Sequence, residues 1–162
     1  MKKSIRISTL LLIAIITIVG TAPSLFAEDA GKADLSGGAL VLTFDDAFVS
    51  QWLAAADIFK QYDARATFFV SNSDRLSKQQ IDSLARLRKE GHTIGCHSLR
   101  HRKAVDFAKK HGIKKYLQSE ITPAVKALRA AGFSPTAFAY PNSQNNEETD
   151  AALLKIFRHL RT

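Results

Sequence analysis

Cysteine is almost absent from this chain of 162 residues, which contains only Cys96. A single cysteine excludes an intramolecular disulfide, so the fold must rely on packing, helped by a metal if one binds. Cys96 lies between Gly95 and His97 at the end of an apolar run. It could supply a thiolate ligand, but we favour a small buried hydrophobe, because successive residues of a strand point to opposite faces.

The chain also lacks an apolar run long enough to cross a bilayer. Its most apolar segment, residues 9–19, has about a dozen residues, whereas a membrane-spanning helix needs ~20. Basic residues precede this segment and mainly small residues follow it up to Ala27, as in a secretory signal peptide. We therefore expect residues 1–27 to be a signal peptide cleaved after Ala27. The protein would then be periplasmic, extracellular or associated with the cell envelope.

The cleavage site is imperfect, because Leu25 occupies a position where a small residue is usual. An uncleaved N-terminal anchor is therefore the alternative, and it is the only membrane contact that we expect.

Motifs for binding nucleic acid are missing too, although the formal net charge is +8. The basic residues cluster only at residues 86–89 and 100–103. We interpret both runs as solvated faces, with attraction to anionic cell-envelope polymers as the weaker alternative.

Residues 28–38 are polar and glycine-containing and indicate a linker, so residues 39–162 form the one expected domain. Within it, apolar runs alternate with helical patterns, which predicts a mainly parallel sheet with helices outside. The predicted strands are residues 39–44, 66–70, 92–96 and 136–140.

Polar and turn residues predict where the helices begin and end. We expect Ser50 to cap one helix, Ser77 and Gln80 to form a capping box, and Thr149 or Asp150 to begin the last helix. Gly91 would end the second helix, and a break is expected near Pro123.

Two carboxylates and two imidazoles follow the predicted strands. Asp45 and Asp46 end the first apolar run, and His97 and His101 follow the third. Because active sites of parallel α/β folds lie at the carboxyl ends of the strands, we expect these side chains to share one edge. Two imidazoles and a carboxylate can hold a divalent ion with positions left open, and a second carboxylate can take a proton from water.

Three motifs occur in the order and spacing of the polysaccharide deacetylases. They are Thr43-Phe44-Asp45-Asp46, His97-Ser98-Leu99-Arg100-His101 and Phe138-Ala139-Tyr140-Pro141. The chain resembles this family, carbohydrate esterase family four with its NodB-homology domain, from about Leu40 onward.

The resemblance implies a distorted (β/α) barrel with a divalent metal, usually zinc, bound by Asp46, His97 and His101. Asp45 would be the general base. The implied substrate is an N-acetylated, sometimes O-acetylated, glycan such as a chitin oligomer, peptidoglycan or poly-N-acetylglucosamine.

The third motif supplies further candidates. The backbone N–H of Asn142 could donate to the oxyanion, and Pro141 would fix the turn before it. Tyr140 could line the sugar site or could equally be a core aromatic residue.

The chain departs from the family pattern at several positions. Ala139 replaces an arginine that commonly orients the base, and Asn142 and Ser143 replace an aromatic residue and a glycine. The later motifs, one containing an acid and tryptophan and one of the form Leu-x-His, do not follow Pro141 in this sequence. Since the histidine of the last motif serves as general acid, we expect an incomplete barrel lacking its last strands, with weak or no turnover.

Two alternatives therefore stay open. The chain could be a truncated or degenerate deacetylase-like domain that binds metal or glycan without turnover, or an unrelated metal-dependent hydrolase on a parallel α/β scaffold. The other histidines, His92, His111 and His159, are interpreted as surface or helix-end residues. Trp52 and the pair Phe68-Phe69 are expected in the core.

Overall fold

Five strands lie side by side in one parallel sheet, in the same order in space as in the sequence. The computed structural model describes residues 40–162, so the predicted signal peptide and linker lie outside the described residues. The strands are β1 (Leu42–Phe44), β2 (Ala66–Val70), β3 (Thr93–Cys96), β4 (Ala137–Ala139) and β5 (His159–Arg161).

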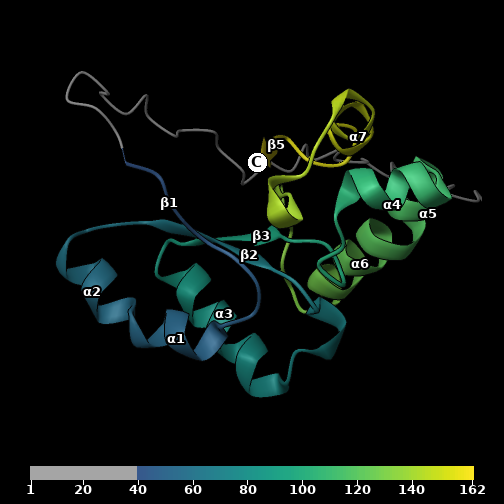
Figure 1. Ribbon diagram of the computed structural model, residues 1–162. Helices are drawn as coiled ribbons and strands as arrows, with labels where there is room; N and C mark the ends of the chain where they lie inside the picture. Colours follow the sequence, from purple (N-terminus) through teal and green to yellow (C-terminus); the bar gives the residue numbers. More distant parts are fainter. Residues whose placement is uncertain (1–39) are drawn as a thin grey trace, which may run out of the picture. The chain divides into compact units, whose positions relative to one another are not determined.

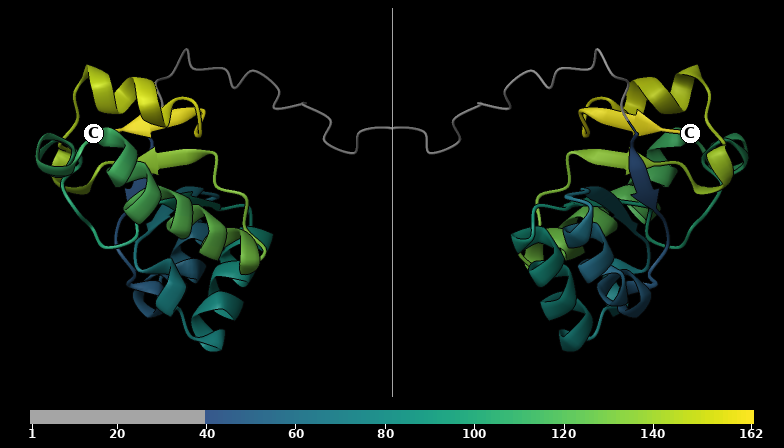
Figure 2. Two further views of the ribbon diagram at one scale, coloured as in Figure 1. Left: turned by 90° about the vertical axis from the view of Figure 1, so that its right-hand side faces the viewer. Right: turned by 90° about the vertical axis from the view of Figure 1, so that its left-hand side faces the viewer.

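Helices connect successive strands. They are α1 (Val49–Ala54), α2 (Ala56–Gln61), α3 (Lys78–Lys89), α4 (Ala104–His111), α5 (Ile113–Tyr116), α6 (Thr122–Ala130) and α7 (Glu147–Leu153). Because every new strand adds to the same edge, the sheet curls into an open half-barrel, with α1 to α3 grouped on one side and α4 to α6 forming a second group (Figures 1 and 2). This architecture confirms the predicted incomplete (β/α) barrel. None of the helices within residues 40–162 is long and apolar enough to cross a membrane.

The core beneath β1 and β2 is aromatic. Phe68 is fully buried, and its ring centroid lies 5.5 Å from that of Phe44, 5.0 Å from that of Trp52 and 6.0 Å from that of Phe59. Offset and edge-on ring pairs at these distances add to the free energy gained by burying the rings. The prediction that Trp52 and Phe68 belong to the core is confirmed, as is that for the buried Phe69.

The predicted starts and ends of the helices were partly correct. The capping box of Ser77 and Gln80 begins α3 as predicted, and Gly91 follows its end with φ +94°. The prediction for Ser50 was wrong: it lies inside α1, where its hydroxyl donates to the neighbouring Gln51, and Phe48 precedes the helix without a side-chain cap. Helix α7 begins at Glu147, earlier than predicted, because Asn146 and Thr149 form its capping box.

The predicted break near Pro123 is present as a π-helical turn, Leu117–Ile121, between α5 and α6. Proline has no N–H for the carbonyl four residues earlier, so the ladder of hydrogen bonds must widen before it.

Strand β5 was not predicted. It has only three residues, two of them charged or polar, and it forms because Ala137, Phe138 and Ala139 of β4 pair with His159, Leu160 and Arg161. His159 is exposed, but it lies in a strand rather than at a helix end.

Candidate metal centre

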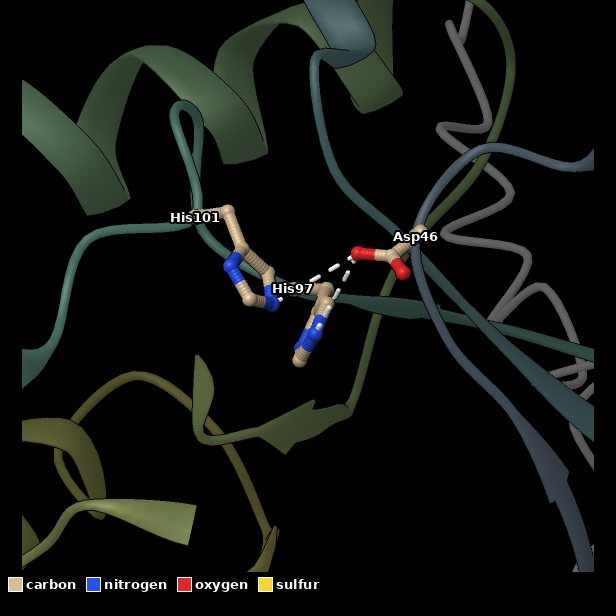
Figure 3. A group of neighbouring side chains, drawn as sticks. All are labelled: Asp46, His97 and His101. Atoms are coloured by element: carbon tan, nitrogen blue, oxygen red, sulfur yellow. Dashed lines mark ion pairs between the residues drawn. The ribbon is translucent and has the colours of Figure 1, made fainter. Parts of the chain in front are cut away.

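The predicted carboxylates and imidazoles meet at the carboxyl ends of the strands. Asp45 and Asp46 directly follow β1, His97 directly follows β3, and His101 lies in the loop before α4. Asp46, His97 and His101 point toward one another from these three segments (Figure 3). The shared edge expected from the sequence is therefore present.

The spacing of these three side chains suits one ion. Asp46 Oδ1 lies 3.9 Å from His97 Nε2 and 3.5 Å from His101 Nε2, and one ligand atom from each residue falls within 4.8 Å of the others. Two ligands of a tetrahedral zinc ion, each bound at ~2.0–2.2 Å, are about 3.3–3.6 Å apart. The three atoms therefore need only small movements to share an ion, and one carboxylate with two imidazoles is a donor set that zinc accepts.

His97 is fixed in the tautomer that a metal ligand requires. Its Nδ1 lies 2.8 Å from the carbonyl oxygen of Ala139 in β4, so Nδ1 carries the proton and Nε2 faces Asp46 with a free lone pair. Burial lowers the pKa of His97 and so favours the neutral ring, while the Ala139 carbonyl and the nearby aspartates act in the opposite direction.

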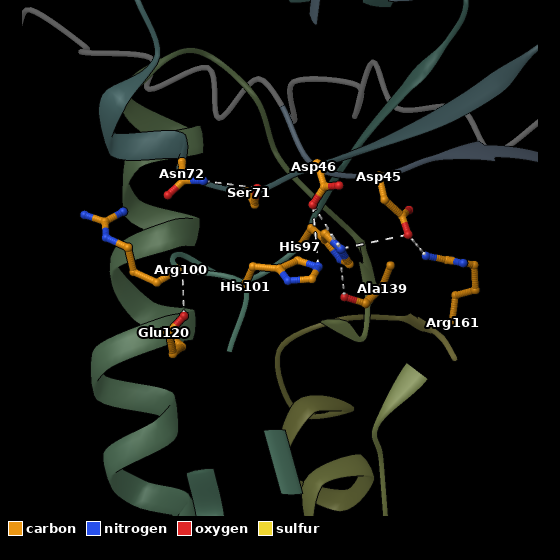
Figure 4. A network of polar contacts seen from close by, with 10 residues as sticks. All are labelled: Asp45, Asp46, Ser71, Asn72, His97, Arg100, His101, Glu120, Ala139 and Arg161. Atoms are coloured by element: carbon orange, nitrogen blue, oxygen red, sulfur yellow. Dashed lines mark hydrogen bonds and ion pairs between the residues drawn. The ribbon is translucent and has the colours of Figure 1, made fainter. Parts of the chain in front are cut away.

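Asp45 is held by a residue that the sequence did not single out. Arg161, from β5, places Nη2 2.5 Å from Asp45 Oδ2 (Figure 4). The two residues are 116 positions apart and lie on opposite edges of the described sheet, so no local pattern marks the pair.

The loop that carries His101 is fastened to the helices by Glu120. This carboxylate is 2% exposed; its Oε2 accepts the backbone N–H of Arg100 at 2.7 Å, and its Oε1 forms an ion pair with Arg102 Nε at 3.2 Å. The guanidinium of Arg100 binds Asp74 through two hydrogen bonds. The interpretation of residues 100–103 as a solvated face was therefore wrong for Arg100, whose guanidinium is paired and 29% exposed, whereas Arg102 is 59% exposed as expected.

The residues of the third motif do not belong to the group formed by Asp46, His97 and His101. Tyr140 and Pro141 are buried, and the Tyr140 hydroxyl donates to Asp150 Oδ1 at 2.7 Å. This favours the core alternative for Tyr140, whose role in sugar binding stays a prediction. Asn142 is exposed with φ +55°, and within residues 40–162 no hydrogen bond joins it to the aspartates or histidines. Its role as oxyanion donor also stays a prediction.

Two other expectations have clear outcomes. Cys96 is fully buried, and burial raises its pKa to about 12, so it remains a neutral thiol as favoured. The surface interpretation of His92 was wrong, since this histidine is buried against Phe59 and Phe68 and its Nδ1 accepts the backbone N–H of Ala66. His111 is exposed at the last position of α4, as expected.

The sequence and fold are similar to those of known proteins. The family model described as polysaccharide deacetylase matches residues 32–156. A chitin deacetylase from Colletotrichum lindemuthianum is 36% identical over 67 residues, which cover 40% of this chain and 27% of the relative. A peptidoglycan-N-acetylglucosamine deacetylase from Bacillus cereus is 34% identical over 97 residues, which cover 60% of this chain and 31% of the relative.

A solved structure supports the same likeness. The peptidoglycan deacetylase PdaC from Bacillus subtilis superimposes with a TM-score of 0.57 and 25% identity, covering 75% of this chain and 56% of that chain. The chain thus spans about half the length of this solved relative and about a third or less of the two curated relatives.

Proposed function

Since the chain belongs to the polysaccharide deacetylase family, we propose that it is a metal-dependent hydrolase that removes N-acetyl or O-acetyl groups from an amino-sugar polysaccharide. The observation that carries the proposal is the convergence of Asp46, His97 and His101 beside a second carboxylate, Asp45, at the carboxyl edge of the sheet. We propose that Asp46, His97 and His101 bind a divalent metal, zinc being the first candidate. When bound, such an ion supplies a Lewis acid for the acetyl carbonyl and lowers the pKa of water.

In this proposal, side-chain and backbone groups of the protein perform the proton transfer and stabilise the oxyanion. Asp45, the carboxylate beside the proposed ligands, accepts the proton of the attacking water. The backbone N–H of Asn142 donates to the oxyanion that forms on the acetyl group. Tyr140 and Pro141, which are buried, support the wall of the sugar site from behind.

The proposed substrate is an acetylated glycan of the cell envelope or its surroundings: a chitin oligomer, peptidoglycan or poly-N-acetylglucosamine. The names of the two curated relatives, which specify chitin and peptidoglycan, support this class. An exported location follows from the predicted signal peptide, and no nucleic-acid partner is proposed.

A second candidate is a domain that binds metal or glycan without turnover. It is considered because Ala139 stands where the resemblance implies an arginine beside the base.

Metal analysis and acetate release together separate the two candidates. The purified chain is dialysed against Zn²⁺, its metal content is measured, and acetate release is followed from acetylated chitooligosaccharides and from acetylated peptidoglycan. About one equivalent of zinc with acetate release supports the hydrolase, whereas zinc without acetate supports the binding domain.

The ligand assignment has its own controls. Asp46→Ala should reduce the metal content strongly, whereas Asp57→Ala, an exposed acid on α2, should leave it unchanged. Metal content that survives Asp46→Ala would contradict the assigned ligands.

A further inference from the structure

The two neighbouring aspartates are equally close to the buried histidine. Asp45 Oδ2 and Asp46 Oδ1 each lie 3.9 Å from His97 Nε2. Distance to His97 therefore does not decide which carboxylate binds the ion and which stays free to act on water. Their other partners differ: Asp46 faces His101, and Asp45 faces Arg161.

Arg161 is held in place from three directions. Its backbone is part of β5, where it pairs with Ala139 and its carbonyl oxygen accepts the N–H of Tyr140 at 2.8 Å. Its guanidinium lies over the ring of Phe69, 5.2 Å from the centroid, and binds Asp45 Oδ2. The arginine and aspartate side chains are 35% and 34% exposed, so the pair is partly shielded from water. A guanidinium fixed in this way offers a stable alternative partner to the carboxylate.

Resting on the function proposed above, we propose that Arg161 is the positioning residue that keeps Asp45 off the metal and so gives the two aspartates different roles. The guanidinium binds Oδ2, the oxygen 3.9 Å from His97 Nε2, and Oδ1 is buried without a hydrogen-bond partner among the described residues. Without Arg161, Asp45 would be free to turn toward the ion as a further ligand, and the free base would be lost.

The position of Arg161 also accounts for a departure noted in the sequence. Ala139 occupies the position where the resemblance implies an arginine beside the base, and the register of β4 and β5 places Arg161 directly beside Ala139. Paired residues of adjacent parallel strands direct their side chains to the same face of a sheet. Arg161 thus lies on the strand next to the position where the resemblance implies an arginine, and its guanidinium still reaches Asp45.

The test compares Arg161→Met with Arg158→Met, which removes the same charge from an exposed residue three positions earlier. Zinc affinity is measured by competition with a chelating dye, and the visible absorption of the Co²⁺-substituted protein reports the coordination number. For Arg161→Met we expect a roughly tenfold lower Kd and weaker Co²⁺ absorption as a further carboxylate joins the ion. Arg158→Met should match the unmodified chain in both.

Two further variants test whether Asp45 is the carboxylate that changes the Kd and the Co²⁺ spectrum of Arg161→Met. In an Asp45→Asn background, Arg161→Met should change neither the Kd nor the Co²⁺ spectrum, because the carboxylate that would turn is gone. Arg161→Lys should give an intermediate spectrum, since an ammonium keeps the charge but lacks the planar fork. If acetate release is measurable, Arg161→Met should lower kcat by about 10- to 100-fold with little change in KM.

The outcomes separate this inference from the function on which it rests. A wild-type chain that binds no zinc overturns the proposed function and this inference with it. A wild-type chain that binds zinc, with an Arg161→Met variant of identical Kd and Co²⁺ spectrum, overturns only the role of Arg161. Circular dichroism of each variant confirms that the fold is intact.

Discussion

Glu120 is the buried carboxylate that ties the His101 loop to the helices, and replacing it tests how that loop is held. Both of its oxygens are used, one by the Arg100 N–H at 2.7 Å and one by Arg102 Nε at 3.2 Å. Glu120→Gln preserves the size of the side chain but replaces one acceptor by an NH₂ group. One of the two donors must then face another donor.

The expected loss in the free energy of unfolding depends on how exposed the two partners of Glu120 are. The Arg102 side chain is 59% exposed, so its guanidinium can turn to water, and the Gln oxygen would keep the Arg100 N–H. The expected loss comes from the ion pair with Arg102 and from the weaker bond of the Arg100 N–H to a neutral acceptor, together about 1.5–2 kcal/mol. Glu120→Leu removes both acceptors and leaves the Arg100 N–H without a partner, for an expected loss of about 3–5 kcal/mol.

Urea unfolding followed by circular dichroism gives these free energies, and zinc titration of the same samples gives the effect on the site. We expect zinc affinity to fall about 10- to 100-fold in both variants, because His101 depends on the loop. Glu148→Gln, at an exposed position of α7, is the control and should stay within about 0.5 kcal/mol of wild type. An equally small effect of Glu120→Gln would refute the assigned role.

Three other substitutions or probes test the packing around the site. Gly95→Ala would place a β-carbon 2.5 Å from Phe69 Cδ1, so thermal melting should show a loss of about 1–3 kcal/mol, and a wild-type melting curve would mean that the ring moves freely. The buried Tyr116 hydroxyl has no partner among the described residues, so Tyr116→Phe should leave the free energy of unfolding unchanged or raise it by about 1 kcal/mol, and a clear loss would reveal a missed hydrogen bond. Because burial raises the pKa of Cys96 to about 12, a thiol reagent at pH 8 should react slowly with the native chain and fast in urea; equal rates would contradict its burial.

Much of the fold could be predicted because its elements carry local signals. β2 is a mainly apolar run bounded by polar residues, and the capping box of Ser77 and Gln80 marks the start of α3. The group formed by Asp46, His97 and His101 was predictable for a related reason: each candidate follows an apolar run, and the carboxyl ends of parallel strands lie at one edge.

The parts that could not be predicted depend on contacts between distant residues. β5 has three residues and no periodicity of its own, and it exists only as the partner of β4. Arg161 reaches Asp45 across 116 positions, and the buried His92 accepts the N–H of Ala66 across 26 positions. Such pairings depend on how distant segments meet in the folded sheet, and no pattern among neighbouring residues indicates them.

The backbone of two proposed ligands shows how the rest of the sheet supports the site. Asp46 and His101 have φ of +79° and +55°, in the left-handed region that costs L-residues about 1–2 kcal/mol each. Conformations of this kind persist only where the surroundings fix them.

The end of β2 provides that support. The N–H of Ser71 donates to the carbonyl of Asp46 at 2.7 Å, the N–H of Asn72 donates to that of Leu99 at 2.9 Å, and the carbonyl of Val70 accepts the N–H of His97 at 3.0 Å. A strand that contributes no ligand therefore connects the segment carrying the carboxylates to the segment carrying the imidazoles. All three contacts are made by backbone atoms, so they do not depend on which side chains residues 70–72 carry. The sequence therefore predicted where the proposed ligands lie but not which hydrogen bonds hold their two segments together.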